Sequence, residues 1–296
     1  MKLLKLVPAD TNIKFLKVRL PFFVVSLLLI AASWALVFTQ GLNYGVDFAG
    51  GQEVRLTFED QKEAPIPELR ELVSDLGYGS PVVQGFGGPN QVSIRISLPE
   101  EVEAEEGAAN EIGNAVIAAI ADKYPDARKD GNDTVGGKVA GEFRSAALLA
   151  LIAAMVAVAL YIWIRFEWQF GVGALFALFH DVSLTLGLFA VFQLEFSLQI
   201  IAAILSIIGY SLNDTIVVYD RIRENLKKFR KMPLPELLDL SINETLARTV
   251  MTSLTLLVAL VPLLVYGPAS LFGLVAAITA GLFIGTYSSV YLASPI

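Results

Sequence analysis

The stretch Ile207–Asn225 reads IIGYSLNDTIVVYDRIREN and decides the fold, because it carries an Asn-Asp-Thr triplet into the end of an apolar run. That run otherwise has the character of a membrane span. A carboxylate in hydrocarbon costs roughly 2.5 to 3.5 kcal/mol on insertion scales, so such residues face the interior of a helix bundle and commonly mark a path for ions or protons. Asp214 is therefore the first candidate for a functional residue.

The composition indicates that lipid solvates part of the chain. Hydrophobic residues make up 55% of the 296 residues, and the mean hydropathy is +0.61, well above that of an ordinary soluble domain. Six apolar runs reach the about 20 residues that a helix needs to cross a hydrocarbon core of roughly 30 Å. We predict a polytopic α-helical membrane protein with transmembrane helices at residues 21–39, 143–165, 170–194, 196–219, 249–267 and 269–292.

The net charge of −7 hides a segregation that predicts the orientation. Residues 40–142 carry 19 acidic against 8 basic side chains, whereas residues 1–20 carry five Lys and Arg and residues 221–231 carry six. Basic segments stay in the cytoplasm. We therefore expect a cytoplasmic N-terminus at 1–20 and a cytoplasmic basic loop at 220–248, with both termini inside. The acidic segment 40–142 is expected on the outside.

The segment 40–142 is long enough for a small domain of its own. Alternating and helical patterns follow one another in it, an order typical of an α+β domain. The predicted elements are strands at Glu53–Phe58 and Val92–Ile96, helices at Ile66–Val73 and Glu101–Ala121, and a returning strand and loop at Asp126–Gly141.

A glycine-rich stretch, Tyr44–Gly51, follows the first span and reads YGVDFAGG. Its glycines permit tight turns and close approach of backbones, and Asp47 is expected to cap the turn. The later glycine-rich stretches at 85–88 and 136–138 lack the Walker pattern of a phosphate-binding loop. The sequence therefore predicts no cofactor and no metal.

Two polar stripes with helical spacing run along the fourth and fifth spans. Polar faces in lipid are expected to meet and to form hydrogen bonds, which would place Asp214 near Arg248. The stripes consist of Ser206, Tyr210, Asn213, Asp214 and Thr215 on the fourth span, and of Thr245, Arg248, Thr252 and Thr255 on the fifth.

Asp214 and Arg248 allow a functional and a structural interpretation. In the first, the carboxyl takes up and releases a proton while the arginine biases it, since desolvation favours the neutral acid and a nearby cation favours the charged form. In the second, a fixed ion pair ties two helices together and Arg248 extends toward the cytoplasmic edge. The residues alone leave both open.

His180 and Asp181 lie together inside the third span, with Thr185 four residues further on. As the only histidine, His180 suggests a proton relay. A hydrogen-bonded pair with a structural role in a polar bundle core is the alternative, and one histidine without a second polar layer favours it.

Motifs distributed from the first span to the last carry a resemblance to a known family. They are Tyr44–Gly51, Val135-Gly136, the YIWIRFE run at Tyr161–Glu167, His180-Asp181, the NDT triplet with RIREN at Arg221–Asn225, and NETLART at Asn243–Thr249. Together they resemble the smaller, SecF-type subunits of the bacterial SecDF family of protein-export complexes, which are relatives of the RND transporters.

The resemblance implies a site, partners and a location. The family residues that match Asp214 and Arg248 belong to a proton pathway. The resemblance implies SecD as partner in a heterodimer, the SecYEG translocon, YajC and a translocating unfolded polypeptide as further partners, and the bacterial cytoplasmic membrane as location. RND-like bundles pair two halves, so six spans would supply one half and SecD the other. No nucleic-acid partner is expected.

Other function classes are an RND-type exporter of a different substrate, a passive membrane scaffold, and an enzyme. An intramembrane aspartyl protease built on Asp181 and Asp214 would need a Gly-x-Gly-Asp signature. The sequence reads Ser211-Leu212-Asn213-Asp214 instead. We therefore expect no enzymatic activity.

The orientation is testable because the chain has no cysteine, so each introduced thiol is unique. With Asn110→Cys, an impermeant thiol reagent should label intact cells from outside. With Lys228→Cys, labelling should require permeabilised membranes. The reverse pattern would discard the predicted orientation together with the external position of residues 40–142.

Overall fold

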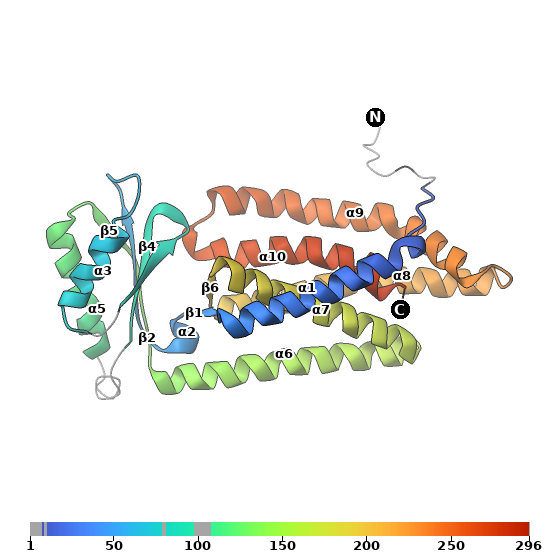
Figure 1. Cartoon of the computed structure of the whole chain (residues 1–296), viewed down its shortest axis with the longest axis horizontal. Coiled ribbons are helices and arrows are strands. Elements are labelled where there is room, and N and C mark those ends of the chain that lie inside the picture. The colour runs from blue at the N-terminus through green and yellow to red at the C-terminus, as the bar shows by residue number, and fades with distance from the viewer. Residues whose placement is uncertain (1–7, 9–10, 79–80, 98–107, 296) are drawn as a thin grey trace.

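The long apolar runs of the sequence form long helices in a computed structural model that describes residues 8, 11–78, 81–97 and 108–295. The helices lie side by side along the long axis, and a small domain with a sheet sits beyond one end (Figure 1). They are α1 (Arg19–Thr39, preceded by a 3-10 turn at Leu16–Val18), α6 (Gly137–Arg165), α7 (Trp168–Phe192), α8 (Leu198–Lys228), α9 (Leu234–Tyr266) and α10 (Ala269–Ser288), which continues as a π-helical turn at Ser289–Ala293.

Within the described residues, six helices are long and apolar enough to cross a membrane, which confirms the predicted fold class. The helices extend beyond the apolar runs on which the prediction rested. The segment 220–248, expected as a basic loop, is helical except for residues 229–233. Asn225 near the end of α8 donates hydrogen bonds to Ser241 and Glu244 of α9, at 3.0 and 2.8 Å. These contacts join the two helices beyond the apolar runs, where polar residues continue both helices.

The small domain is a four-stranded antiparallel sheet in the order β3-β4-β2-β5, with two helices packed on one face. Its elements are β2 (Gly51–Phe58), α3 (Ile66–Asp75), β3 (Val82–Phe86), β4 (Gly88–Ile96), α5 (Ala108–Lys123) and β5 (Ala127–Val135).

The alternating residues of β2 explain this arrangement. Val54, Leu56 and Phe58 point to the helices and are buried with Leu69 of α3 and Ile120 of α5. The strands and helices predicted from the sequence are confirmed where they are described, but residues 137–141 of the expected returning loop belong to α6. The first part of the predicted helix, residues 101–107, lies outside the described residues. Strand β3 was not predicted, because Val82–Phe86 contains a glycine and a glutamine and shows no clear alternation.

Gly51 opens β2 in a conformation that only glycine adopts easily. Its φ is +109°, and an added Cβ would overlap the backbone oxygen of Ile96 on β4. The glycine-rich stretch therefore allows β2 to approach β4 closely where the chain leaves the bundle.

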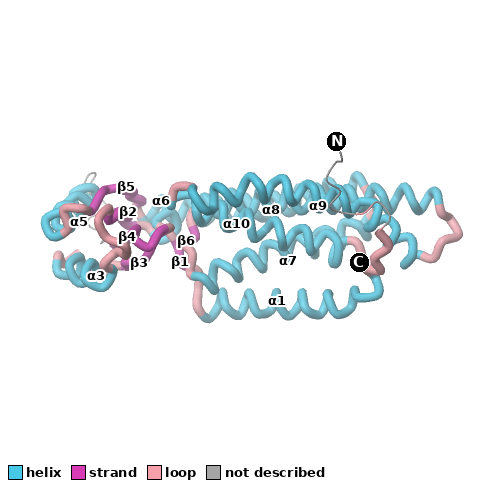
Figure 2. Tube along the Cα trace, turned by 90° about the horizontal axis from the view of Figure 1, so that it is seen from above, coloured by secondary structure: helices cyan, strands magenta, loops and turns pink. Residues whose placement is uncertain are grey.

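Small residues let α10 pack against α8. A Cβ at Gly281 would overlap the side chain of Ile207, and one at Gly285 would lie 3.1 Å from the Cβ of Ser211. Close approach through small residues is a common way for helices to associate in lipid, where no hydrophobic effect drives them together. On the other side of the bundle α1 lies beside α7 (Figure 2), with Ser33 against Gly187.

A short joint connects the small domain to the bundle. Strand β1 (Asn43–Tyr44) pairs in parallel with β6 (Glu195–Phe196), which lies between α7 and α8. After β1, the single turn α2 (Val46–Ala49) carries Asp47, which accepts a hydrogen bond from the backbone N–H of Leu198 at 2.8 Å. Asp47 thus caps the first turn of α8 and not its own turn, a long-range contact that local sequence could not reveal.

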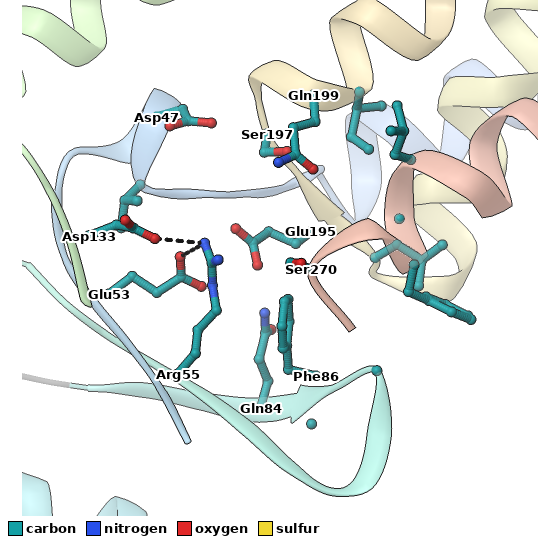
Figure 3. A pocket seen from close by; sticks show the side chains of 18 of the residues that line it. Asp47, Glu53, Arg55, Gln84, Phe86, Asp133, Glu195, Ser197, Gln199 and Ser270 are labelled. Atoms are coloured by element: carbon teal, nitrogen blue, oxygen red, sulfur yellow. Dashed lines mark hydrogen bonds and ion pairs between the residues drawn. The ribbon is translucent and has the colours of Figure 1, made fainter. Parts of the chain in front are cut away.

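The other face of the sheet and the joint enclose a cavity of about 630 Å³ (Figure 3). On the domain side lies Glu53, which is fully buried and accepts hydrogen bonds from Arg55 and Ser93, both at 2.6 Å. On the bundle side lies Glu195, one of whose carboxyl oxygens is buried and has no hydrogen-bond partner among the described residues. Two acidic side chains thus meet across the joint.

This environment changes the acidity of Glu195. Burial and then the charge of Glu53 raise its pKa from 4.5 to about 7, although Arg95 and Arg55 act in the opposite direction. Between these two pH values the folded chain holds a proton that the unfolded chain has lost. The stability that Glu195 contributes is therefore fully present below pH 4.5 and is lost as the pH rises to about 7.

Glu195→Gln should consequently stabilise the protein above neutrality, because an amide fills the same space without a charge. We expect a gain on the order of 2 kcal/mol at pH 8 that vanishes toward pH 4.5. Chemical unfolding of the full chain in detergent at a series of pH values measures it. Glu71→Gln, at an exposed glutamate of α3, is the matched control and should leave the free energy of unfolding unchanged. A gain that does not depend on pH would contradict the assignment.

Candidate functional site

Asp214 lies in α8 with 1% of its surface exposed. Neither carboxyl oxygen has a hydrogen-bond partner within the described part of the chain. The hydroxyl of Thr252 on α9 lies near this carboxyl and donates to the backbone oxygen of Thr249, at 3.0 Å. A charged carboxylate buried without a partner costs several kcal/mol, so this environment favours the neutral acid.

Arg248 does not approach Asp214. It is exposed on α9, and no ion pair of the described residues joins it to a carboxylate. Thr245 and Thr249 are buried on α9, whereas Arg248, at the edge of the same helix face, is exposed. The expected contact between Asp214 and Arg248 is therefore absent from this chain by itself. Spacing placed the arginine on the polar side of its helix but could not show whether its side chain reaches Asp214.

The remaining stripe residues divide into inward and outward groups. Inward, the hydroxyl of Tyr210 bonds Ser253 at 2.7 Å, and Ser253 bonds Thr286 of α10 at 2.8 Å. This chain of hydroxyls connects α8, α9 and α10. Thr215 is also buried.

The outward group lies on the surface of two neighbouring helices. Ser206 and Thr255 are exposed and donate to the backbone oxygen four residues earlier, at 2.8 and 2.7 Å, which satisfies a hydroxyl in lipid. Asn213 on α8 is exposed as well. With Arg248, these residues form a polar outer surface on helices that are otherwise apolar, and such a surface calls for a partner.

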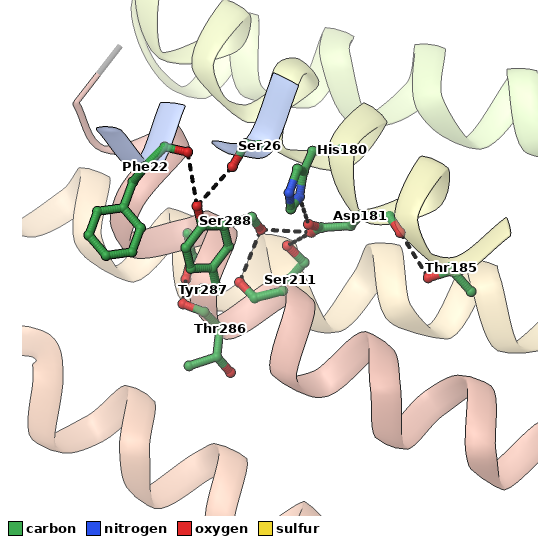
Figure 4. Close-up of polar contacts among 11 residues, drawn as sticks. Phe22, Ser26, His180, Asp181, Thr185, Ser211, Thr286, Tyr287 and Ser288 are labelled. Carbon is green, nitrogen blue, oxygen red and sulfur yellow. Dashed lines mark hydrogen bonds and ion pairs between the residues drawn. The ribbon is translucent and has the colours of Figure 1, made fainter. Parts of the chain in front are cut away.

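His180 and Asp181 form a hydrogen-bonded pair at the centre of the bundle, with Nδ1 2.9 Å from Oδ1. Both side chains are fully buried. Asp181 also accepts from Ser211 of α8 at 2.6 Å and from Ser288 of α10 at 2.8 Å (Figure 4). Neither serine was predicted to belong to the site. Ser211 stands three residues before Asp214, and this spacing was the available signal; nothing in the sequence linked Ser288 to the pair.

Family models match most of the chain. The C-terminal region of protein export membrane proteins SecD/SecF matches residues 115–296, and the SecD/SecF GG motif matches residues 35–62. The second match contains Asp47, which holds the joint to α8, and Gly51, which opens β2.

Curated relatives and solved structures agree. The chain is 43% identical to the protein translocase subunit SecF of Rhodobacter capsulatus, covering 99% of this chain and 90% of that protein. It is 39% identical to SecF of Vibrio alginolyticus, covering 98% of this chain and 90% of that protein.

Among solved structures, the crystal structure of SecDF from Thermus thermophilus, a translocon-associated membrane protein, covers 98% of this chain with a TM-score of 0.88 and 35% identity. This chain spans 38% of that longer one. A second structure, SecDF in a super-membrane-facing form, has a TM-score of 0.71 and 34% identity, covering 98% of this chain and 39% of that one. Taken with the six helices and the small sheet domain, these likenesses show that the chain belongs to the SecF family of protein translocase subunits.

Proposed function

We propose that this chain and SecD together use the proton gradient to promote translocation of polypeptides through SecYEG, with Asp214 as the proton-carrying group. The observation that carries the proposal is the burial of Asp214 without a hydrogen-bond partner among the described residues. A carboxyl held only for structure would be expected to have partners, because an unsatisfied buried polar group costs free energy. A carboxyl that must exchange a proton needs a site that does not fix one charge state.

The polar outer surface of α8 and α9 supports a partner half. In lipid, an exposed Arg248 and Asn213 would each be costly. A second six-helix half packed against this surface would bury both, as RND-like halves pair about an axis along the membrane normal. The fused SecDF chain, of which this chain spans 38%, is consistent with SecD as that half. Arg248 would then bias Asp214 within the assembled pair.

The proposed cycle follows from charge. Protonation makes Asp214 neutral and lets the helices around it pack as an apolar bundle; release restores a charge that must be solvated, which favours a different arrangement of α8. A charge that crosses 100 mV yields about 2.3 kcal/mol, enough to bias a conformational equilibrium about fiftyfold. The two SecDF structures match this chain with TM-scores of 0.88 and 0.71 at nearly equal identity, which supports more than one arrangement in the family.

The proposed placement in the membrane follows the charge segregation. The external domain, residues 40–142, would lie outside the bacterial cytoplasmic membrane, where it could hold or move against the emerging polypeptide. Both termini and the connection at residues 229–233 would lie in the cytoplasm, near SecYEG and YajC. The proposed spans are the apolar parts of the six helices.

Asp214→Asn is the decisive substitution, because the amide keeps the shape of the side chain and cannot ionise. We expect a complex with SecD that assembles normally and loses gradient-dependent export by at least about a hundredfold, the lower range for a positioned proton-transfer group. Proton flux and export in reconstituted vesicles measure the effect, and co-purification with SecD measures assembly.

The matched control is Asp220→Asn, the same chemical change on the same helix. Asp220, two turns before the end of α8, is half-exposed and forms an ion pair with Arg165 at 3.4 Å, and surface pairs of this kind contribute little. This variant should export like the wild type. Full gradient-dependent export with asparagine at 214 would end the proposal and favour a passive scaffold, in which the hydroxyl chain through Tyr210 and Ser253 only joins helices.

A further inference from the structure

A second buried carboxyl, Asp181, lies in the same bundle in the opposite situation to Asp214. It accepts three hydrogen bonds, from His180 on its own helix, Ser211 on α8 and Ser288 on α10. Hydrogen bonds to a carboxylate favour its charged form. The cluster is therefore built to hold Asp181 as an anion in the middle of the helices.

The imidazole of His180 is only half satisfied. Its Nδ1 faces Asp181, whereas Nε2 is buried and has no partner among the described residues. The nearest aromatic neighbour with a hydroxyl is Tyr287, with ring centres 5.8 Å apart, and that hydroxyl is engaged by Ser26 at 2.8 Å and by the backbone oxygen of Phe22 at 3.1 Å. A purely structural histidine would be expected to use both ring nitrogens.

Charge makes the unused nitrogen significant. A neutral imidazole beside the Asp181 carboxylate leaves a net charge of −1 in a medium where charge is costly. The groups that face the pair are hydroxyls, from Ser211 on α8, from Ser288 on α10 and, beyond them, from Tyr287 on α10; within the described residues the histidine is the sole ion-pair partner of Asp181. Accepting one proton at Nε2 would turn the pair into a neutral imidazolium–carboxylate pair without moving any helix.

The pair is also close to Asp214 along α8. Ser211, which donates to Asp181, precedes Asp214 by three residues, a rise of about 4.5 Å along a helix. Asp214 and the Ser211 contact of Asp181 thus lie on one turn of α8. A negative charge on either carboxyl makes a negative charge on the other less favourable.

We propose that His180 and Asp181 form a second proton-binding site, coupled to Asp214 through the α8 turn that contains Ser211. The inference rests on the proposed function, since it gives the bundle two sites for the transported proton. Its step is an acid–base transfer: the Nε2 lone pair accepts a proton from a hydronium ion, which leaves as water, and the Nδ1–H bond to Asp181 is kept. The reverse transfer to water releases the proton.

The single histidine of this chain permits a direct measurement. In the complex with SecD in vesicles, ¹⁵N-histidine spectra are recorded from pH 5 to pH 8, and subtraction of the His180→Asn spectrum removes the signals of the partner. We expect Nε2 of His180 to change between unprotonated and protonated within this range. We also expect Asp214→Asn to change the protonated fraction of His180 at a given pH, because the two sites share one turn of α8. An imidazole with one fixed protonation state over the whole range would overturn the proposal.

Transport gives the second readout. In His180→Asn the amide N–H can replace the Nδ1 donor to Asp181 but cannot take up a proton, so assembly should persist while proton flux falls about tenfold or more. Thr185→Val, a buried polar residue on the same helix whose hydroxyl bonds only the backbone oxygen of Asp181 at 2.8 Å, should keep wild-type flux. Wild-type flux in His180→Asn would also overturn the proposal.

The two hypotheses fail separately. Normal export with Asp214→Asn would refute the proposed function, irrespective of the results for His180. Three results together would refute only the second proton-binding site. They are loss of export with Asp214→Asn, one fixed protonation state of His180, and normal proton flux in His180→Asn. Should His180→Asn fail to assemble, the spectra of the wild type in partner-unlabelled complexes, reconstituted from separately prepared subunits, would still decide.

Discussion

The structure depends on one constraint, that every polar group placed among apolar helices must be neutral or have partners. The two buried carboxyls meet this constraint in opposite ways. Asp181 is surrounded by donors from two other helices and its own neighbour. Asp214 has no hydrogen-bond partner in the described part of the chain, although it is equally buried. One site therefore favours a charge and the other disfavours it, and both act on α8.

Close helix packing makes this difference possible. Because Gly285 lets α10 approach α8 at Ser211, the serines of both helices reach the same carboxylate oxygen of Asp181. A larger residue at 285 would separate these donors. Gly285, whose sequence signal indicates only helix packing, thus also determines which hydrogen-bond donors reach the Asp181 carboxylate.

Much of the fold followed from the sequence, because its signals were local. Apolar runs predicted the six helices, and alternation in Glu53–Phe58 predicted β2, an inner strand of the four-stranded sheet. Asp214 and the His180–Asp181 pair were identified because ionisable residues in an apolar run are conspicuous. The exposure of Arg248 in this chain could not be predicted, since spacing gives the face of a helix but not the contacts of a side chain on it. The roles of Ser288 and Asp47 depend on contacts more than 100 residues apart in the sequence.

The contact of Asp47 has the widest consequence for how the parts of the molecule are connected. It fixes the first turn of α8 to the joint that carries the sheet domain, while Glu195 and Glu53 meet across the cavity beside it. The same helix holds Ser211 and Asp214 further along and contacts α9 at its far end through Asn225. A helix is stiff along its axis, so a shift of α8 that follows a change of charge near Asp214 would be transmitted to its capped end. The sheet domain and Asp214 are therefore attached to one rigid element, which Asp181 contacts through Ser211.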